Sequence, residues 1–220
     1  DPCCRIARSM IFGKIYNARW SIERTRRDHG LRLDSGHLSS VSSQLKELLP
    51  QITEAFSLDA LRGLEGAGAT LYFSVFDQML LGEKPFFQFS GRNRRPPQDP
   101  ANALLSFAYS LLTHDCASAL ESVGLDSYVG FLHRDRPGRT SLALDLIEEL
   151  RPCMADRFVL TLVNNRVVGK SDFDIQENGA VFLNDMGRRT FLKHWQTRKQ
   201  EILTHPYLQE KLSWGLVPYI

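Results

Sequence analysis

A histidine and two carboxylates lie close together in residues 131–150, FLHRDRPGRTSLALDLIEEL. His133 lies just upstream of a turn that contains proline, glycine and arginines, and a helix is predicted to restart after that turn. On this helix Asp145 and Glu148 are three residues apart, so their side chains lie on one face. An imidazole and carboxylates beside arginines favour a divalent metal with a phosphate-bearing substrate. A helix with one apolar and one acidic face is also ordinary on any protein surface, so this stretch alone leaves both interpretations open.

A second stretch, LRGLEGAGATLYFSVF, places Glu65 among Gly63, Gly66 and Gly68 in an otherwise helical pattern. A glycine inside a helix costs about 1 kcal/mol relative to alanine. Three of them therefore predict that another element approaches the helix that carries Glu65. A glycine-rich nucleotide loop is the alternative, and it is disfavoured because GLEGAGA continues a helical pattern and does not follow a strand.

Hydrophobic periodicity predicts a mainly α fold with one β-hairpin. The expected helices cover residues 5–29, 36–49, 58–81 and 100–113, a short segment that ends at Gly124, the segment that carries Asp145, residues 152–164, and a last long helix from Asp185. Pro50 is expected to end the second helix, and Asp99 to cap the fourth. Residues 83–99 are expected to form an irregular loop. The hairpin covers about 172–184, with Asn178–Gly179 as its turn.

The bulk composition is that of an ordinary globular protein, with 43% apolar and 24% charged residues among 220. We expect one helical domain over 1–220. No apolar run approaches the roughly 18–20 residues of a membrane span, and we expect a cytoplasmic protein that does not contact a membrane. The net charge of +2 is too small to indicate nucleic-acid binding, and the four cysteines have no C-x-x-C spacing that would indicate zinc.

Three motifs, LRGLEGAGATLYF, RRPPQDPANALLSFAYSLL and VGLDSYVGFLHRDRPGRTSLALDLIEELRP, occur in this order. Together they closely resemble the helical catalytic domain of the CRISPR-associated integrase of spacer acquisition, the prokaryotic Cas-one family. The resemblance covers nearly the whole chain. Members of the family carry a β-rich N-terminal domain ahead of the helical one. That domain is absent from this sequence, which begins at Asp1 without methionine, so we expect a piece of a longer protein.

The resemblance implies that Glu65, His133 and Glu148 are the catalytic metal ligands, with Mg²⁺ or Mn²⁺ as the ion. Asp145 is then either a residue that orients His133 or an alternative ligand. The arginine-rich loop RNRRPP is a weaker candidate for DNA contact, and Lys14 falls in a motif that recurs in relatives. The first candidates for holding DNA near the metal are Arg62, Tyr72, Asn102, Arg136 and Arg139.

The implied reaction joins the 3′-hydroxyl of a DNA fragment to a phosphodiester at the edge of a CRISPR repeat. The implied partners are double-stranded DNA (the prespacer and the CRISPR repeat and leader), a second copy in a homodimer, a small Cas-two dimer, and a fused or separate end-processing nuclease. Two alternatives remain open: a metal-dependent DNA nuclease without joining activity, and a non-catalytic DNA-binding helical module. A strand-transfer assay tests the first, and DNA binding that survives loss of the acidic site would indicate the second.

Overall fold

The structure is a computed structural model that describes residues 2–134, 136–204 and 208–219. Its elements are α1 (Pro2–His29), η1 (Gly30–Arg32), α2 (Ser35–Glu54), α3 (Leu58–Ser74), α4 (Phe76–Met79), α5 (Pro100–Ser122), α6 (Ser141–Leu150), η2 (Arg151–Asp156), α7 (Arg157–Asn164), η3 (Lys170–Asp172), β1 (Phe173–Ile175), β2 (Val181–Leu183), α8 (Asp185–Lys199), β3 (Ile202–Thr204), β4 (Lys211–Ser213) and η4 (Trp214–Tyr219). The prediction of a mainly α fold is confirmed.

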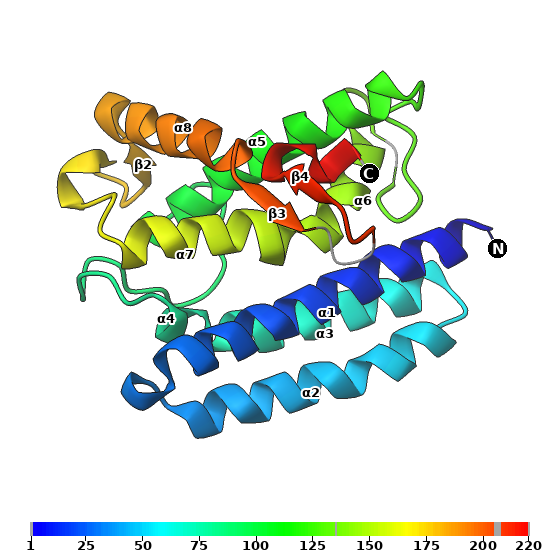
Figure 1. Ribbon diagram of the computed structural model, residues 1–220, viewed down its shortest axis with the longest axis horizontal. Coiled ribbons are helices and arrows are strands. Elements are labelled where there is room, and N and C mark those ends of the chain that lie inside the picture. Colours follow the sequence, from blue (N-terminus) through cyan, green and yellow to red (C-terminus); the bar gives the residue numbers. More distant parts are fainter. Residues whose placement is uncertain (1, 135, 205–207, 220) are drawn as a thin grey trace.

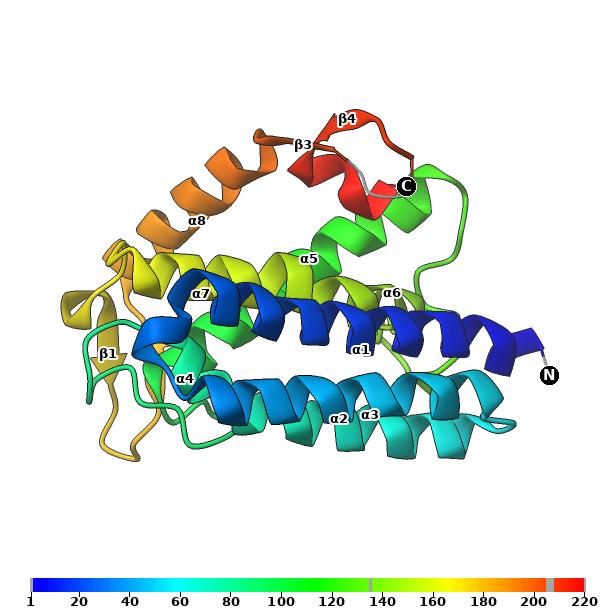
Figure 2. The same ribbon diagram turned by 60° about the horizontal axis from the view of Figure 1, so that its bottom comes forward.

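The helices are arranged in layers. Helices α1, α2 and α3 lie side by side, α5, α6 and α7 pack over them, and α8 with the C-terminal hairpin covers the outer side (Figures 1 and 2). Helix α1 packs against α2, α3 and α6, because Ile11, Ile15 and Ile22 are fully or almost fully buried on its inner side. This central position lets α1 contribute side chains to both halves of the molecule.

The close approach expected at the glycines of α3 is confirmed at one of three positions. A β-carbon on Gly68 would collide with Ile15 Cδ1 of α1, so any larger residue there would force the buried Ile15 side chain to move. The prediction is wrong for Gly63 and Gly66, where a β-carbon would have no heavy atom within 4 Å. The packing therefore explains one glycine beside Glu65, and nothing in the structure explains the other two.

Three helix predictions are wrong. The helix expected over 58–81 is interrupted at Val75, which separates α3 from α4. Helix α2 continues through Pro50 to Glu54, since Pro50 is exposed at the surface while Ile52 beyond it is fully buried. Burying Ile52 offsets the backbone hydrogen bond that proline removes. Helix α5 is one helix from Pro100 to Ser122, not two. Asp99 caps it as predicted, accepting a hydrogen bond from the backbone N–H of Asn102 at 2.7 Å.

The chain also stays helical across Pro152, where a break was expected. Between α6 and α7 lies the wide π-type turn η2, Arg151–Asp156. Proline has no N–H to donate, and a widened turn tolerates the missing bond. Single π-type turns occur frequently at functional sites. Here η2 places Arg151 and Asp156 on the wall of the cavity described below.

The predicted hairpin is confirmed, and a second one was missed. Strands β1 and β2 pair antiparallel, with Gly179 in the turn at φ +79°. The second hairpin pairs β3 with β4 and packs with η4 close to α8. No helix in the described ranges is long and apolar enough to cross a membrane.

Candidate functional site

The loop that carries His133 is held by one buried carboxylate. Asp145 of α6 is fully buried, and its Oδ2 accepts hydrogen bonds from the backbone N–H groups of Phe131 and Leu132 at 2.6 and 2.9 Å. Its Oδ1 accepts from the His133 backbone N–H at 2.9 Å and lies 2.6 Å from Nδ1 of the same ring. A carboxylate at this distance keeps the proton on Nδ1, which leaves Nε2 with a free lone pair. Since both Asp145 oxygens are engaged, the geometry favours orientation of His133 over metal ligation by Asp145.

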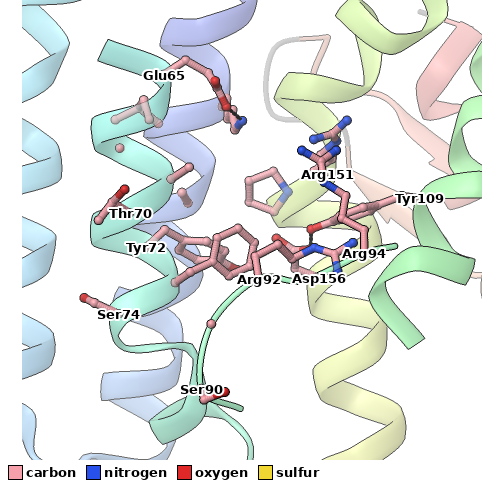
Figure 3. Close-up of a pocket in the computed structure, with 18 residues that line it drawn as sticks. Glu65, Thr70, Tyr72, Ser74, Ser90, Arg92, Arg94, Tyr109, Arg151 and Asp156 are labelled. Atoms are coloured by element: carbon pink, nitrogen blue, oxygen red, sulfur yellow. Dashed lines mark hydrogen bonds and ion pairs between the residues drawn. The ribbon is translucent and has the colours of Figure 1, made fainter. Parts of the chain in front are cut away.

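Two further carboxylates converge on a lysine. Lys14 of α1 forms an ion pair with Glu65 Oε1 of α3, and its Nζ lies 2.7 Å from Glu148 Oε2 of α6. On the other oxygen of Glu148, Arg151 Nη2 lies at 3.1 Å and His133 Nε2 at 4.0 Å. Figure 3 shows Glu65 projecting from α3 into the space that faces Arg151. The structure thus brings Glu65, Glu148 and His133, from three separate segments, to one small region.

The electrostatics of this region favour a cation. Glu148 is buried, and burial by itself would raise the pKa of its carboxyl group. The positive charges of Arg151 and Lys14 outweigh burial and lower the pKa of Glu148 to about 2. Glu148 is therefore ionised throughout the physiological range. A buried carboxylate in this state requires a positive partner, which Lys14 and Arg151 supply here.

The residues fit a divalent cation only if Lys14 moves. Within the described residues, no group of three or more His, Cys, Asp or Glu side chains is arranged to hold a metal ion. The Lys14 ammonium lies between the two carboxylates, where it stands in for such a cation. Glu148 Oε2 is buried and accepts no hydrogen bond with good geometry, although Lys14 Nζ lies 2.7 Å away. Two carboxylates and an imidazole nitrogen are donors suited to Mn²⁺ and, with waters, to Mg²⁺.

Arg62 holds the His133 loop from the other side. Its Nη2 donates to the backbone carbonyl of Leu132 at 2.6 Å, and its Nη1 pairs with Asp59 at 2.7 Å. Both ends of the guanidinium thus have partners inside the protein. Arg62 therefore holds the loop beside His133, and since its side chain is 33% exposed the predicted DNA contact stays a prediction.

Tyr72 and Asn102, two further predicted DNA contacts, are both buried. Tyr72 is 3% exposed, and burial with the nearby Asp156 raises the pKa of its hydroxyl well above the ordinary value. Asn102 is 0% exposed, and its side chain bonds to Asp99 and Arg92 at 2.5 Å each. It fastens the arginine-rich loop to the start of α5. Burial disfavours direct contact of either side chain with DNA in this conformation, and the two predicted contacts stay predictions.

Arg136 and Arg139 remain free for the predicted role. Arg136 is exposed, Arg139 is partly exposed, and a backbone hydrogen bond of 3.0 Å joins them in one turn. In the described part of the chain, neither guanidinium has an ion-pair partner. The turn follows directly on the loop of His133, so both side chains can meet a phosphate near the candidate site.

A cavity of about 570 Å³ opens beside Glu65 and Lys14 and was not predicted. Its polar wall away from Glu65 is formed by Arg92, Arg94, Tyr109, Arg151 and Asp156 (Figure 3). Asp156 is 1% exposed and accepts a hydrogen bond from the Tyr109 hydroxyl at 2.6 Å. Burial raises the pKa of Asp156 to about 6, although Tyr109 and Arg151 oppose that effect. The spacing of Arg151, three residues after Glu148 on a helical path, was the signal available in the sequence.

Comparisons with known proteins identify relatives over nearly the full length. The profile of the family described as "CRISPR associated protein Cas1" matches residues 1–197. "CRISPR-associated endonuclease Cas1 2" of Rhodospirillum rubrum is 50% identical over 98% of this chain and 64% of its own length. "CRISPR-associated endonuclease Cas1" of Leptospira interrogans is 44% identical over 98% of this chain and 84% of its own length. A "CRISPR-associated exonuclease Cas4/endonuclease Cas1 fusion" of Geobacter sulfurreducens is 40% identical over 97% of this chain and 38% of its own length.

Solved structures share the fold. A "Casposase bound to integration product" superposes with a TM-score of 0.83 at 27% identity, over 99% of this chain and 58% of that one. A Cas1 protein from Thermotoga maritima superposes with a TM-score of 0.80 at 28% identity, over 99% of this chain and 62% of that one. A chain of a "Cas6-RT-Cas1--Cas2 complex" superposes with a TM-score of 0.80 at 26% identity, over 99% of this chain and 23% of that one. The chain thus spans less than two thirds of these solved chains and 64% of its Rhodospirillum rubrum relative.

Proposed function

Because the chain belongs to the Cas1 family of CRISPR-associated proteins, we propose that it is the helical catalytic part of a metal-dependent DNA endonuclease and integrase that inserts spacers into a CRISPR array. The proposal rests mainly on the Lys14 ammonium, which contacts both Glu65 and Glu148, with His133 Nε2 4.0 Å from the other oxygen of Glu148. The similarity to a casposase bound to its integration product supports joining of DNA ends over cutting alone.

In the proposed reaction, the oxygen of a DNA 3′-hydroxyl attacks a phosphorus atom at the edge of a CRISPR repeat. A new phosphorus–oxygen bond forms as the bond to the repeat's own 3′-oxygen breaks, and that oxygen leaves as a 3′-hydroxyl after gaining a proton. One phosphodiester replaces another, so no external energy source is required. A bound Mg²⁺ or Mn²⁺ would neutralise charge on the phosphodiester and activate the attacking hydroxyl.

The residues of this chain prepare that site. Glu65, Glu148 and His133 Nε2 would hold the ion. Asp145 keeps the His133 ring in one tautomer and orientation through its 2.6 Å contact with Nδ1. Arg151 binds Glu148 Oε1 at 3.1 Å, which leaves Oε2 directed toward Lys14.

We further propose that Arg136 and Arg139 contact phosphates of the bound DNA, since both are accessible beside the His133 loop. The proposed partners are prespacer and repeat DNA, a second copy of the chain in a homodimer, and a Cas2-type dimer. The relative in a Cas6-RT-Cas1--Cas2 complex supports the Cas2-type partner. The relative fused to a Cas4 exonuclease supports an end-processing nuclease as a further partner.

Replacing Glu65 or His133 by alanine tests the proposal. Strand transfer of a labelled 3′ end into a repeat-bearing duplex with Mn²⁺ or Mg²⁺ should collapse in both variants. DNA affinity should change little, because phosphate contacts come mainly from arginines. Glu47→Ala is the matched control, since Glu47 is an exposed acid on α2.

Each alternative predicts a different result. Full, metal-dependent strand transfer by either alanine variant would refute the metal assignment. Cutting without joining by the unaltered protein would favour the nuclease alternative. DNA binding with neither cutting nor joining, in the presence of both metals, would favour the non-catalytic module.

A further inference from the structure

A second cavity, of about 400 Å³, lies among α1, η2, α7 and α8 and shares no lining residue with the cavity beside Glu65. Helix α7 runs between α1 and α8 (Figure 1), and each of the three contributes one arginine to the groove. These are Arg24, Arg157 and Arg198, joined by His194 of α8. The only acidic residue among the described residues that line the groove is Glu201. The groove lining thus carries more positive than negative side chains.

Internal ion pairs leave one of these charges uncompensated. Arg198 forms an ion pair with Glu201, and Arg24 Nε lies 3.6 Å from Asp28 Oδ2. The guanidinium of Arg157 makes no hydrogen bond or ion pair with any described residue. Burial and the repulsion from Arg24 and Arg198 lower the pKa of Arg157. A partly buried cation beside two others is costly unless an anion binds there, so the groove fits an anionic ligand.

An exposed aromatic stripe leads along α1 to this groove. Phe12, Tyr16 and Trp20 recur every four residues and are 37%, 44% and 49% exposed. Arg24 is the next residue at that spacing, so the stripe and the groove meet on one face of α1. Successive ring centroids lie 6.4 and 6.1 Å apart, and the Arg19 guanidinium lies 5.2 Å from the Trp20 ring. Three large aromatic side chains in contact and exposed to solvent indicate a binding surface.

We propose that this groove and the aromatic stripe of α1 together bind a single-stranded segment of DNA, with phosphates on Arg24 and Arg157 and bases stacked on Tyr16 and Trp20. A cationic groove combined with stacking aromatic rings is the arrangement that binds single strands without sequence preference. An acidic protein segment would use the cations but has no planar bases to stack on the stripe. From Phe12 to Arg24 the surface extends about 18 Å along the helix. The choice of DNA rests on the proposed function, whereas the choice of a single strand rests on the stripe.

The double variant Arg24→Gln with Arg157→Gln tests the phosphate contacts. Binding of a labelled single-stranded oligonucleotide to the purified full protein is measured by fluorescence anisotropy at several salt concentrations. Each lost contact to a single strand should reduce the slope of log affinity against log salt by about 0.7, or about 1.4 for both. Lys46→Gln with Arg189→Gln is the control: both residues are exposed and outside the groove, and the pair changes the net charge equally.

A Trp20→Ala variant tests the stacking and leaves the groove arginines in place. Since Trp20 is 49% exposed, the variant should fold normally, and its affinity for the oligonucleotide should fall roughly 5- to 150-fold. Polyglutamate and inorganic phosphate are added as competitors at the same concentration of negative charge. We expect neither to displace the oligonucleotide as well as an unlabelled strand does.

Three results would overturn the inference: an unchanged salt slope in the Arg24 and Arg157 variant, unchanged affinity in the Trp20 variant, or equally effective displacement by polyglutamate. The last would assign the groove to an acidic protein partner. These results are separable from the proposed function. Strand transfer by the unaltered protein with no effect of the groove variants would refute the groove alone. Loss of strand binding in those variants, with no transfer by the unaltered protein, would refute the proposed function alone.

Discussion

Replacing Lys14 by methionine removes the charge that lies between the two carboxylates and keeps an unbranched side chain that is one atom shorter. Lys14 is 11% exposed at its side chain, Glu148 is 4% exposed, and Glu65 is 29% exposed. The methionine would leave Glu148 with Arg151 as its remaining close cation and would leave Glu65 without the ion pair. We therefore expect the variant to be less stable and to bind divalent cations more readily.

The expected loss follows from the pKa of Glu148. A fall from the ordinary 4.5 to about 2 corresponds to about 3.4 kcal/mol of stabilisation of the ionised form. Arg151 supplies part of this stabilisation of Glu148. The ion pair between Lys14 and the partly exposed Glu65 adds little, because solvent screens it. We expect the free energy of unfolding to fall by about 2–3 kcal/mol, which lowers the Tm of a chain of this size by roughly 5–10 °C.

The pH dependence has a defined sign. Because the folded pKa of Glu148 is lowered, its contribution is complete above the ordinary pKa of 4.5 and is lost as the pH falls from 4.5 toward about 2. The difference in stability between the unaltered protein and the Lys14→Met variant should therefore narrow across this window. At neutral pH the difference should be largest.

Thermal unfolding with and without Mn²⁺ completes the assay. In the unaltered protein a divalent cation must displace the Lys14 ammonium, whereas in the variant it meets two unpaired carboxylates. Mn²⁺ at about 100 times its Kd raises the free energy of unfolding by about 2.7 kcal/mol. The Lys14→Met variant should reach this increase at a lower Mn²⁺ concentration than the unaltered protein. Lys46→Met, at an exposed position, should shift stability by less than about 0.5 kcal/mol. An unchanged Tm at neutral pH, or equal stabilisation by Mn²⁺ in both proteins, would refute the reasoning.

Four further variants test the same region. Glu148→Ala should be inactive in strand transfer at any metal concentration. Asp145→Asn should lose strand-transfer activity by roughly 10- to 100-fold, and excess Mn²⁺ should partly restore it. A tolerated Glu148→Ala together with an inactive Asp145→Asn would make Asp145 the ligand. Arg136→Gln with Arg139→Gln should lower the salt slope of duplex DNA binding by about 1.8, and an unchanged slope would mean that these arginines only hold their loop. Asp156 has a folded pKa of about 6 against an ordinary 3.8, so the unaltered protein should lose about 3 kcal/mol of stability as the pH rises from 4 to 6. Asp156→Asn, followed by thermal unfolding across that range, should not show this loss, and an identical pH dependence would contradict the pKa.

Much of the fold could be predicted from local sequence. Apolar periodicity places α1, and the Asp99–Pro100 cap marks the start of α5, because both signals act within one or two helical turns. Asn178–Gly179 identifies the first hairpin for the same reason. The errors arose where burial outweighed local preference. Helix α2 passes Pro50, and the chain stays helical at Pro152, because the apolar residues beyond each proline are buried.

The candidate site likewise combines features that local sequence predicts with features that only helix packing decides. The sequence by itself determined that Glu65, His133 and Glu148 lie on particular helix faces and loops, because spacing along a helix sets the direction of a side chain. Only the tertiary structure decided which groups face one another. Lys14 meets Glu65 and Glu148, which lie far from it in the chain, and Asn102 turns inward to fasten a loop. Helical spacing cannot predict such partners, since they depend on how the helices pack against one another.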